Sequence, residues 1–302
     1  MTDLTEPHVL AERQARPTGP FAELLEIERL DENTFRGHCH AGAPMRAFGG
    51  HVAAQALVAA GRTCEDRRPV HSLHGYFLLP GSPARPIDYA VERVRDGMSY
   101  TTRRVTALQQ GSEIFTLSVS FKHPEPAADR QREVPPLPRP ESLPDALARG
   151  PEEVRRAIAA TGGFRDLDVR FVPADAPGLP PTVPGLLQQF VWMRTASPLP
   201  ADEPLLHAGA LTYLSDLTLA STAGLNVQPN FFQRTEPPRL VMASLDHAMW
   251  FHRPFRADEW LLFAQRSPSS SDGRGLALGE FYDLDGRLVA SAVQEALIRD
   301  PA

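Results

Sequence analysis

The sequence has 302 residues, 42% of them hydrophobic and 23% charged, which is the balance of a globular chain of about two average domains. That composition excludes wholesale disorder, a fibrous repeat and a small disulfide-stapled fold. A formal net charge of -6 argues against the strongly basic face that nucleic-acid binding needs. No apolar run approaches the roughly 20 residues of a membrane span. We therefore expect neither nucleic acid nor a membrane span.

The two ends and the cysteines predict the compartment. The first 13 residues include several acids and lack the apolar core of a secretory signal. The last residues, Arg299 to Ala302, carry no peroxisomal address. Cys39 and Cys64 form no C-x-x-C pair, so they predict no metal cage. We expect a cytoplasmic protein with reduced thiols.

The first half of the chain predicts one helix followed by antiparallel strands. The helix spans Gly50 to Gly61 and is almost uncharged, which is typical of a buried helix. Strands are predicted at Ile87–Val94, Tyr100–Leu108 and Ile114–Phe121. Gln110-Gly111 predicts the turn between the last two. In the third strand alternate residues are apolar, which indicates that one face is buried.

The middle of the chain is rich in proline. More than half of the 30 prolines lie between Pro124 and Pro204. The run from Pro135 to Pro140 excludes a helix or a central strand. We predict an extended connector here, interrupted by one short helix from Glu152 to about Ala160.

The second half repeats the order of the first. A helix is predicted from about His207 to Gly224. The strands predicted after it are Trp260–Gln265, Gly275–Tyr282 and Leu288–Ile298. Asp285-Gly286 predicts a hairpin turn. The interval from Pro80 to Pro254 nearly equals that from Gly111 to Gly286, which indicates an internal repeat.

These patterns predict an α+β fold made of two fused units. In each unit an antiparallel sheet wraps around a central helix, and the two sheets join edge to edge, which hides their unpaired strands. The predicted domains are residues 1–123 and 186–302, with the connector at residues 124–185.

Two polar residues interrupt apolar surfaces of the second half. Asp216 lies on a mostly apolar helix face, and a buried unpaired carboxylate is costly or takes up a proton. Gln294 lies on a strand face of small apolar residues. The repeat places Ala53 opposite Asp216 and Val119 opposite Gln294. Each polar residue is therefore either a hydrogen-bonded structural residue or part of one asymmetric site.

Other polar residues give weaker signals. Ser244 supplies a hydroxyl at the start of a strand. His247 and His252 are spaced so that they lie on opposite strand faces, which argues against a metal site. The chain has no nucleophile elbow, no P-loop and no dinucleotide fingerprint, so we predict no cofactor.

Several motifs together resemble a known family. They are Phe48-Gly49-Gly50, Val70 to Gly81, Arg95-Asp96-Gly97, Leu214-Ser215-Asp216, Ser244 to Phe255, Gly279 to Tyr282 and Val289 to Glu295. With them the chain resembles acyl-CoA thioesterase II, the double-hotdog thioesterase family, over nearly its whole length. The resemblance implies two hotdog folds and hydrolysis of fatty acyl-CoA to free acid and CoA. It also suggests a homodimer or a higher homo-oligomer.

The resemblance also implies which residues act. In the family an Asp, a Thr or Ser, and a Gln hold the attacking water, and here these positions are Asp216, Ser244 and Gln294. Backbone N–H groups of Gly49 and Gly50, at a helix N-terminus, are expected to stabilise the oxyanion. This chain has Ser244 where many relatives have Thr, and it has His51 where relatives commonly have Gln.

The remaining predictions concern substrate binding. His71 matches a family histidine, with either a binding or a structural role. CoA carries phosphates, so arginines are expected at its entrance, and the candidates are Arg93, Arg95, Arg103, Arg104 and Arg274. Two alternatives stay open: a non-catalytic acyl-CoA-binding module and a hotdog enoyl-thioester hydratase. The hydratase normally needs a His near the helix acid, but Ser221 stands five residues after Asp216.

Overall fold

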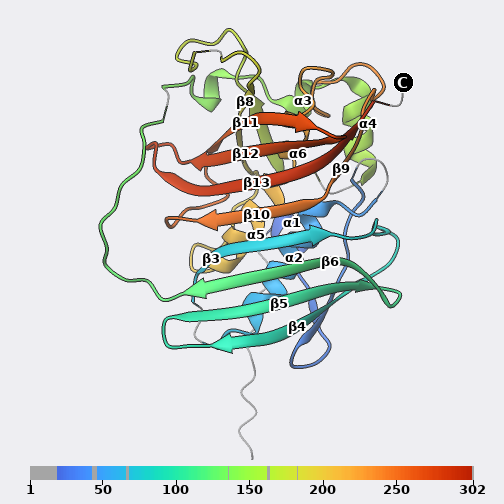
Figure 1. Cartoon of the computed structure of the whole chain (residues 1–302), viewed down its shortest axis with the longest axis vertical. Coiled ribbons are helices and arrows are strands. Elements are labelled where there is room, and N and C mark those ends of the chain that lie inside the picture. Colours follow the sequence, from blue (N-terminus) through green and yellow to red (C-terminus); the bar gives the residue numbers. More distant parts are fainter. Residues whose placement is uncertain are drawn as a thin grey trace, which may run out of the picture.

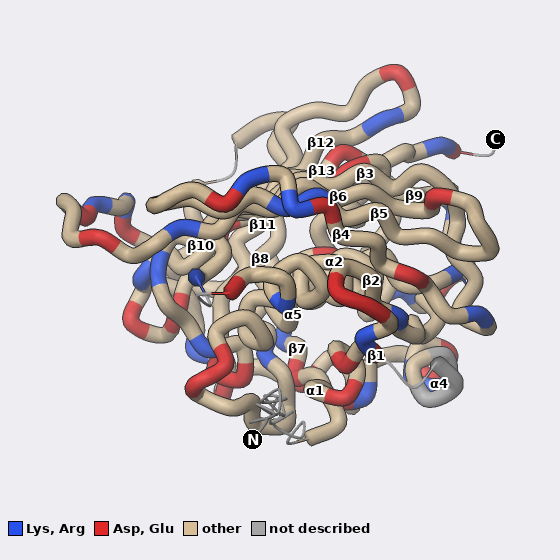
Figure 2. Tube along the Cα trace, turned by 90° about the horizontal axis from the view of Figure 1, so that it is seen from below, with Lys and Arg blue, Asp and Glu red and all other residues tan. Residues whose placement is uncertain are grey.

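The fold is a single curved sheet with helices on its inner side. The computed structural model describes residues 19–42, 46–65, 68–134, 136–161, 164–181 and 183–300. Pro135 and the first 13 residues, for which the sequence predicts no secretory signal, lie outside the described residues. The sheet has 13 strands in the order β1-β2-β4-β5-β6-β3-β10-β13-β12-β11-β8-β7, and β9 pairs with β13 (Figure 1). Helices α2 and α5 lie between the long strands on one side and β1 and β7 on the other (Figure 2).

The first half contains the predicted helix and strands. Its elements are α1 (Pro20–Leu24), β1 (Glu28–Arg29), β2 (Thr34–Gly37), α2 (Gly49–Arg62), β3 (Val70–Phe77), β4 (Ile87–Asp96), β5 (Tyr100–Gln109) and β6 (Ser112–Lys122). Helix α2 is buried along most of its length, as its apolar sequence predicts. The predicted turn is also confirmed, with Gln110 at φ 53° and Gly111 at φ 81°.

The second half repeats this arrangement with one difference. Its elements are β8 (Leu187–Thr195), α5 (Pro204–Ser215), α6 (Leu219–Thr222), β9 (Val241–Ser244), β10 (Asp246–Phe251), β11 (Leu261–Ser271), β12 (Arg274–Tyr282) and β13 (Leu288–Arg299). The predicted strands are confirmed. The prediction of one helix from His207 to Gly224 is wrong, because the chain leaves the helix at Asp216 and resumes it after Thr218.

The two halves join into one sheet through β3 and β10. These strands pair antiparallel, with Leu73 opposite Met249. Behind the joint, α2 and α5 pack closely, since a Cβ atom on Gly209 would lie 3.3 Å from Val58 Cγ2. This confirms the predicted edge-to-edge fusion and leaves neither β3 nor β10 as a free edge.

The first part of the proline-rich connector covers the outer face of the second half, and its later part packs into the inner core. It contains η1 (Pro140–Ser142), α3 (Ala146–Arg149), α4 (Glu152–Thr161) and β7 (Leu167–Phe171). Trp192 donates its Nε1–H to the carbonyl of Pro138 at 3.0 Å, and Val134 and Leu137 pack on the same outer cluster. Strand β7 pairs with β8, so this part of the predicted connector belongs to the sheet. The alternating buried residues Leu167 and Val169 explain why it forms a strand.

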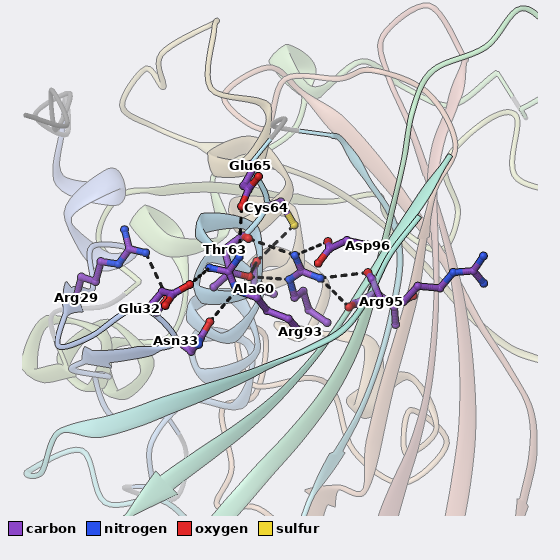
Figure 3. A network of polar contacts seen from close by, with 12 residues as sticks. Arg29, Glu32, Asn33, Ala60, Thr63, Cys64, Glu65, Arg93, Arg95 and Asp96 are labelled. Atoms are coloured by element: carbon purple, nitrogen blue, oxygen red, sulfur yellow. Dashed lines mark hydrogen bonds and ion pairs between the residues drawn. The ribbon is translucent and has the colours of Figure 1, made fainter. Parts of the chain in front are cut away.

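A buried arginine contacts the C-terminal end of α2. Three residues that it contacts, Thr63, Arg95 and Asp96, are labelled in Figure 3. Arg103 on β5 is 1% exposed. Its guanidinium donates to Thr63 Oγ1 at 2.8 Å, to the Thr63 carbonyl at 3.2 Å and to Asp96 Oδ1 at 2.7 Å. It also donates to the carbonyls of Arg95 and Thr102. All of its N–H groups thus have partners, and its charge lies where the helix dipole favours a cation.

We predict that Arg103→Ala lowers the free energy of unfolding by about 2–5 kcal/mol, because it leaves a cavity in the core and removes the donors to the buried Thr63 hydroxyl and carbonyl. The adjacent Arg104 is the control: it is exposed and forms an ion pair with Glu92, so Arg104→Ala costs at most about 1 kcal/mol. Urea denaturation of both variants measures the difference. Equal losses would contradict this role for Arg103.

Candidate functional site

The break in the second helix lies against the start of α2. Asp216 follows the last residue of α5 and has φ -87° and ψ -4°. A Cβ atom on Gly49 would lie 2.9 Å from Asp216 Oδ2, and one on Gly50 would lie 2.7 Å from the Tyr213 carbonyl. Both positions therefore require glycine, because any side chain would push the two helix ends apart.

The three polar residues singled out in the sequence come together at this break. Gln294 on β13 donates from Nε2 to Asp216 Oδ1 at 2.7 Å. Ser244, the last residue of β9, donates from Oγ to the same oxygen at 3.4 Å. The backbone N–H of Gly50 also donates to the Asp216 carboxylate. One carboxylate thus accepts hydrogen bonds from two strands and from the N-terminus of α2.

The electrostatics favour proton uptake by this carboxylate near neutral pH. Burial raises the pKa of Asp216 to about 6, and the hydrogen bonds from Gln294, Gly50 and Ser244 oppose that rise. Gln294 is fully buried, and no described group donates to its Oε1 atom. The Asp216 carboxylate and Gln294 Oε1 are therefore two acceptors beside one another. Such a pair fits a small molecule with two donor hydrogens, such as water.

An aromatic wall borders the site, and the sequence analysis missed it. Phe77 Cε1 would lie 2.9 Å from a Cβ atom on Gly49, next to Asp216. The ring of Phe48 lies 4.9 Å from that of Tyr213 and 5.2 Å from that of Phe164, which lies in the connector between α4 and β7. The only signal in the sequence was the position of Phe48 directly before Gly49. This wall gives the site an apolar side.

His51 is buried but faces away from the Asp216 carboxylate. It is 1% exposed, and its Nε2 lies against the carbonyl of Leu24 and 3.1 Å from Gln55 Nε2. Burial lowers the pKa of His51 to about 3, so its ring is neutral. His51 therefore adds no charge to the site.

The His71 side chain contacts Ser120, and its role in substrate binding stays a prediction. Its Nε2 lies 2.7 Å from Ser120 Oγ, and the neighbours of Ser120 along β6, Val119 and Phe121, point into the core. His71 therefore lies on the outer face of the sheet. The reason is an irregularity in the pairing of β3 with β6 beside Val70, which turns His71 outward.

The candidate arginines lie on different strands and have acidic or backbone partners, and their place at a CoA entrance stays a prediction. Arg95 lies near the C-terminal end of α2, since its carbonyl accepts from the guanidinium that contacts Thr63. A helix of 14 residues separates that end from Gly49, a length of about 20 Å. Arg104 forms an ion pair with Glu92.

Two further arginines from the candidate set are also paired with acids. Arg93 contacts Glu32 and Glu65, and Arg274 contacts Asp272 and Glu295. Over the described trace, basic and acidic residues are interspersed (Figure 2). Acidic residues on neighbouring strands and loops explain why these arginines form ion pairs.

Two predictions of absence concern metals and membranes. Among the described residues no group of His, Cys, Asp and Glu side chains is arranged to hold a metal ion. His247 contacts Ser215, whereas His252 contacts Ser291, so the two histidines have separate partners. No helix in the described part of the chain is long and apolar enough to cross a membrane.

Comparison with known proteins places the chain in a family. Residues 39–122 match the model of the acyl-CoA thioesterase N-terminal domain, and residues 132–298 match that of the acyl-CoA thioesterase C-terminal domain. The chain is 35% identical to human acyl-coenzyme A thioesterase 8 over 288 residues, which cover 91% of this chain and 88% of the relative. It is 34% identical to acyl-CoA thioesterase 2 of Haemophilus influenzae, covering 91% of this chain and 96% of the relative.

Solved structures agree with these matches. An acyl-CoA thioesterase II from Mycobacterium marinum, TesB2, superposes with a TM-score of 0.78 at 44% identity, covering 93% of this chain and 99% of that one. A hotdog-fold protein of unknown function from Alicyclobacillus acidocaldarius superposes with a TM-score of 0.73 at 22% identity, covering 94% of this chain and 100% of that one. The chain belongs to the acyl-CoA thioesterase II family of thioester hydrolases, with one hotdog domain in each half.

Proposed function

We propose that this thioesterase hydrolyses fatty acyl-CoA to free fatty acid and CoA with a water molecule activated by Asp216. The observation that carries the proposal is the convergence of the Asp216 carboxylate, Gln294 and Ser244 at the break between α5 and α6. Relatives covering nearly the whole chain are named for acyl-CoA thioesters, which supports this substrate class. The aromatic wall beside the site suits an acyl chain.

The two acceptors at the site suit an attacking water. In our proposal the water donates one hydrogen to the Asp216 carboxylate and the other to Gln294 Oε1, so that a lone pair faces the thioester carbonyl. As the water oxygen bonds to the carbonyl carbon, Asp216 takes the proton. The tetrahedral intermediate then breaks its C–S bond, and the departing CoA sulfur receives that proton. Ser244 and Gln294 keep the carboxylate in place throughout.

The N-terminus of α2 is the proposed site of oxyanion stabilisation. The N–H of Gly50 donates to Asp216, which orients the carboxylate. The N–H of Gly49 belongs to the same first turn, where the helix dipole favours negative charge. We therefore assign the oxyanion contact to Gly49 and the carboxylate contact to Gly50.

Release of thiol distinguishes this proposal from its alternatives. A non-catalytic binding module would bind acyl-CoA and release no thiol. A hydratase would add water across the double bond of an enoyl thioester and leave the thioester intact. A panel of acyl-CoA substrates of increasing chain length, assayed for free CoA thiol, separates all three.

We predict that Asp216→Asn lowers kcat by about 10²–10⁴-fold, because the amide cannot accept a proton from water. Thiol release measures the loss, and circular dichroism verifies the fold. Asp88→Asn is the matched control, since Asp88 pairs with Arg36 in the first half and contacts none of the site residues. A fully active Asp216→Asn enzyme would refute the proposed base.

The pH dependence follows from the raised pKa of Asp216. Only the carboxylate form accepts a proton, so kcat/KM is predicted to fall below about pH 6, tenfold for each further pH unit. The measurement is kcat/KM with a non-titrating acyl-CoA substrate from about pH 5 to about pH 8. A profile that stays flat down to about pH 5 would contradict both the burial and the role of this carboxylate.

A further inference from the structure

The segment from Ser244 to His247 contacts the flanks of both Asp216 and Gln294. It joins β9 to β10, and both strands pair with β13. Ser244 pairs with Ala296, whereas Ala248 pairs with Val293, so one extra residue bulges between the two pairs. A bulge of this kind redirects the side chains around it. Here the bulge directs the Asp246 side chain to β13 and the His247 side chain to the end of α5.

His247 contacts the residue directly before Asp216. It is 1% exposed, and its Nε2 lies 2.7 Å from the Oγ atom of Ser215, the last residue of α5. No described group accepts from or donates to His247 Nδ1. The proton therefore lies on Nε2, since a proton on Nδ1 would be a buried donor without an acceptor. His247 donates to Ser215, and this bond joins the end of α5 to β10.

Asp246 contacts the residue directly after Gln294. Its Oδ1 atom accepts the backbone N–H of Glu295 at 2.6 Å. Beside it, the N–H of Leu245 donates to the Glu295 carbonyl at 2.9 Å. The bulge disrupts the strand ladder at this point, and the Asp246 carboxylate supplies an acceptor that the ladder does not. The backbone that carries Gln294 is thereby fixed.

From these contacts we propose that His247 and Asp246 are positioning residues for hydrolysis. His247 fixes Asp216 through Ser215, and Asp246 fixes Gln294 through Glu295. Because both belong to one bulged segment that begins at Ser244, the three site residues keep one mutual geometry. This inference rests on the proposed function, since it assumes that Asp216 and Gln294 act on water.

The central test removes both partners of the Ser215–His247 bond. The double variant Ser215→Ala with His247→Leu replaces them by apolar groups, so that no buried histidine is left unpaired, and it also removes the bond that the Ser215 hydroxyl donates to the Thr212 carbonyl at 2.8 Å. We expect a cooperative melting transition, a KM within about twofold of wild type, and a kcat lower by about 10–100-fold, because small misplacements of catalytic groups have effects of this size. A purely structural pair would leave kcat unchanged in the folded variant.

The second test uses a conservative replacement at Asp246. Asp246→Ala removes the acceptor for the Glu295 N–H and is expected to lower kcat by about tenfold or more. Asp246→Asn keeps an oxygen at that position and is expected to restore kcat to within about threefold of wild type. His252→Gln is the control, since His252 contacts Ser291 on the exposed side and takes no part in the proposal.

The outcomes separate this inference from the proposed function. Wild-type kcat in the folded double variant, together with an inactive Asp216→Asn, overturns the positioning role of His247 and leaves Asp216 as the base. Equal kcat for Asp246→Ala and Asp246→Asn overturns the role of Asp246, and it does so even if the double variant fails to fold. Full activity of Asp216→Asn overturns the proposed function itself.

Discussion

The site depends on keeping the Asp216 carboxylate out of bulk water at a helix break. Burial raises its pKa to about 6, and three donors hold the charged form in place. The surrounding architecture serves that constraint. The second helix ends at Ser215, Gly50 lets the start of α2 approach, and β13 brings the Gln294 amide to the carboxylate. Without the close approach of α2, one of the three donors would be missing.

The first half contains a buried charge, Arg103, that has a structural role. Arg103 is about as deeply buried as Gln294, but all of its N–H groups have partners within hydrogen-bond distance. By contrast, Gln294 leaves its Oε1 without a donor among the described residues. Val119, the predicted counterpart of Gln294, is a buried apolar residue of β6. Among the described residues, the buried charge of Arg103 in the first half thus has all its hydrogen bonds, whereas the buried amide of Gln294 in the second half has an acceptor oxygen without a donor.

Much of the fold and the core of the site were predictable from the sequence. The alternation of apolar and polar residues predicted β6 and β13, and turn residues that include glycine predicted their hairpins. An acid and an amide on otherwise apolar faces indicated Asp216 and Gln294 as site residues. The local sequence pattern did not predict the break after Ser215, where the chain packs against the start of α2, a segment distant in sequence. It also missed the outward turn of His71, which a strand irregularity causes. It did not predict the ion pairs of the candidate arginines, because the acidic partners come from other strands and loops.

Single turnover in oxygen-18 water tests the central claim most directly, with enzyme in excess over acyl-CoA. If Asp216 acts as a base on water, the first molecule of free acid carries one oxygen from the solvent, and the peptide that contains Asp216 stays unlabelled. If Asp216 instead attacks the thioester itself, an acyl-enzyme anhydride forms, and its hydrolysis at the Asp216 carbonyl leaves the label in that peptide. We predict label in the acid alone; label in the Asp216 peptide would contradict the account.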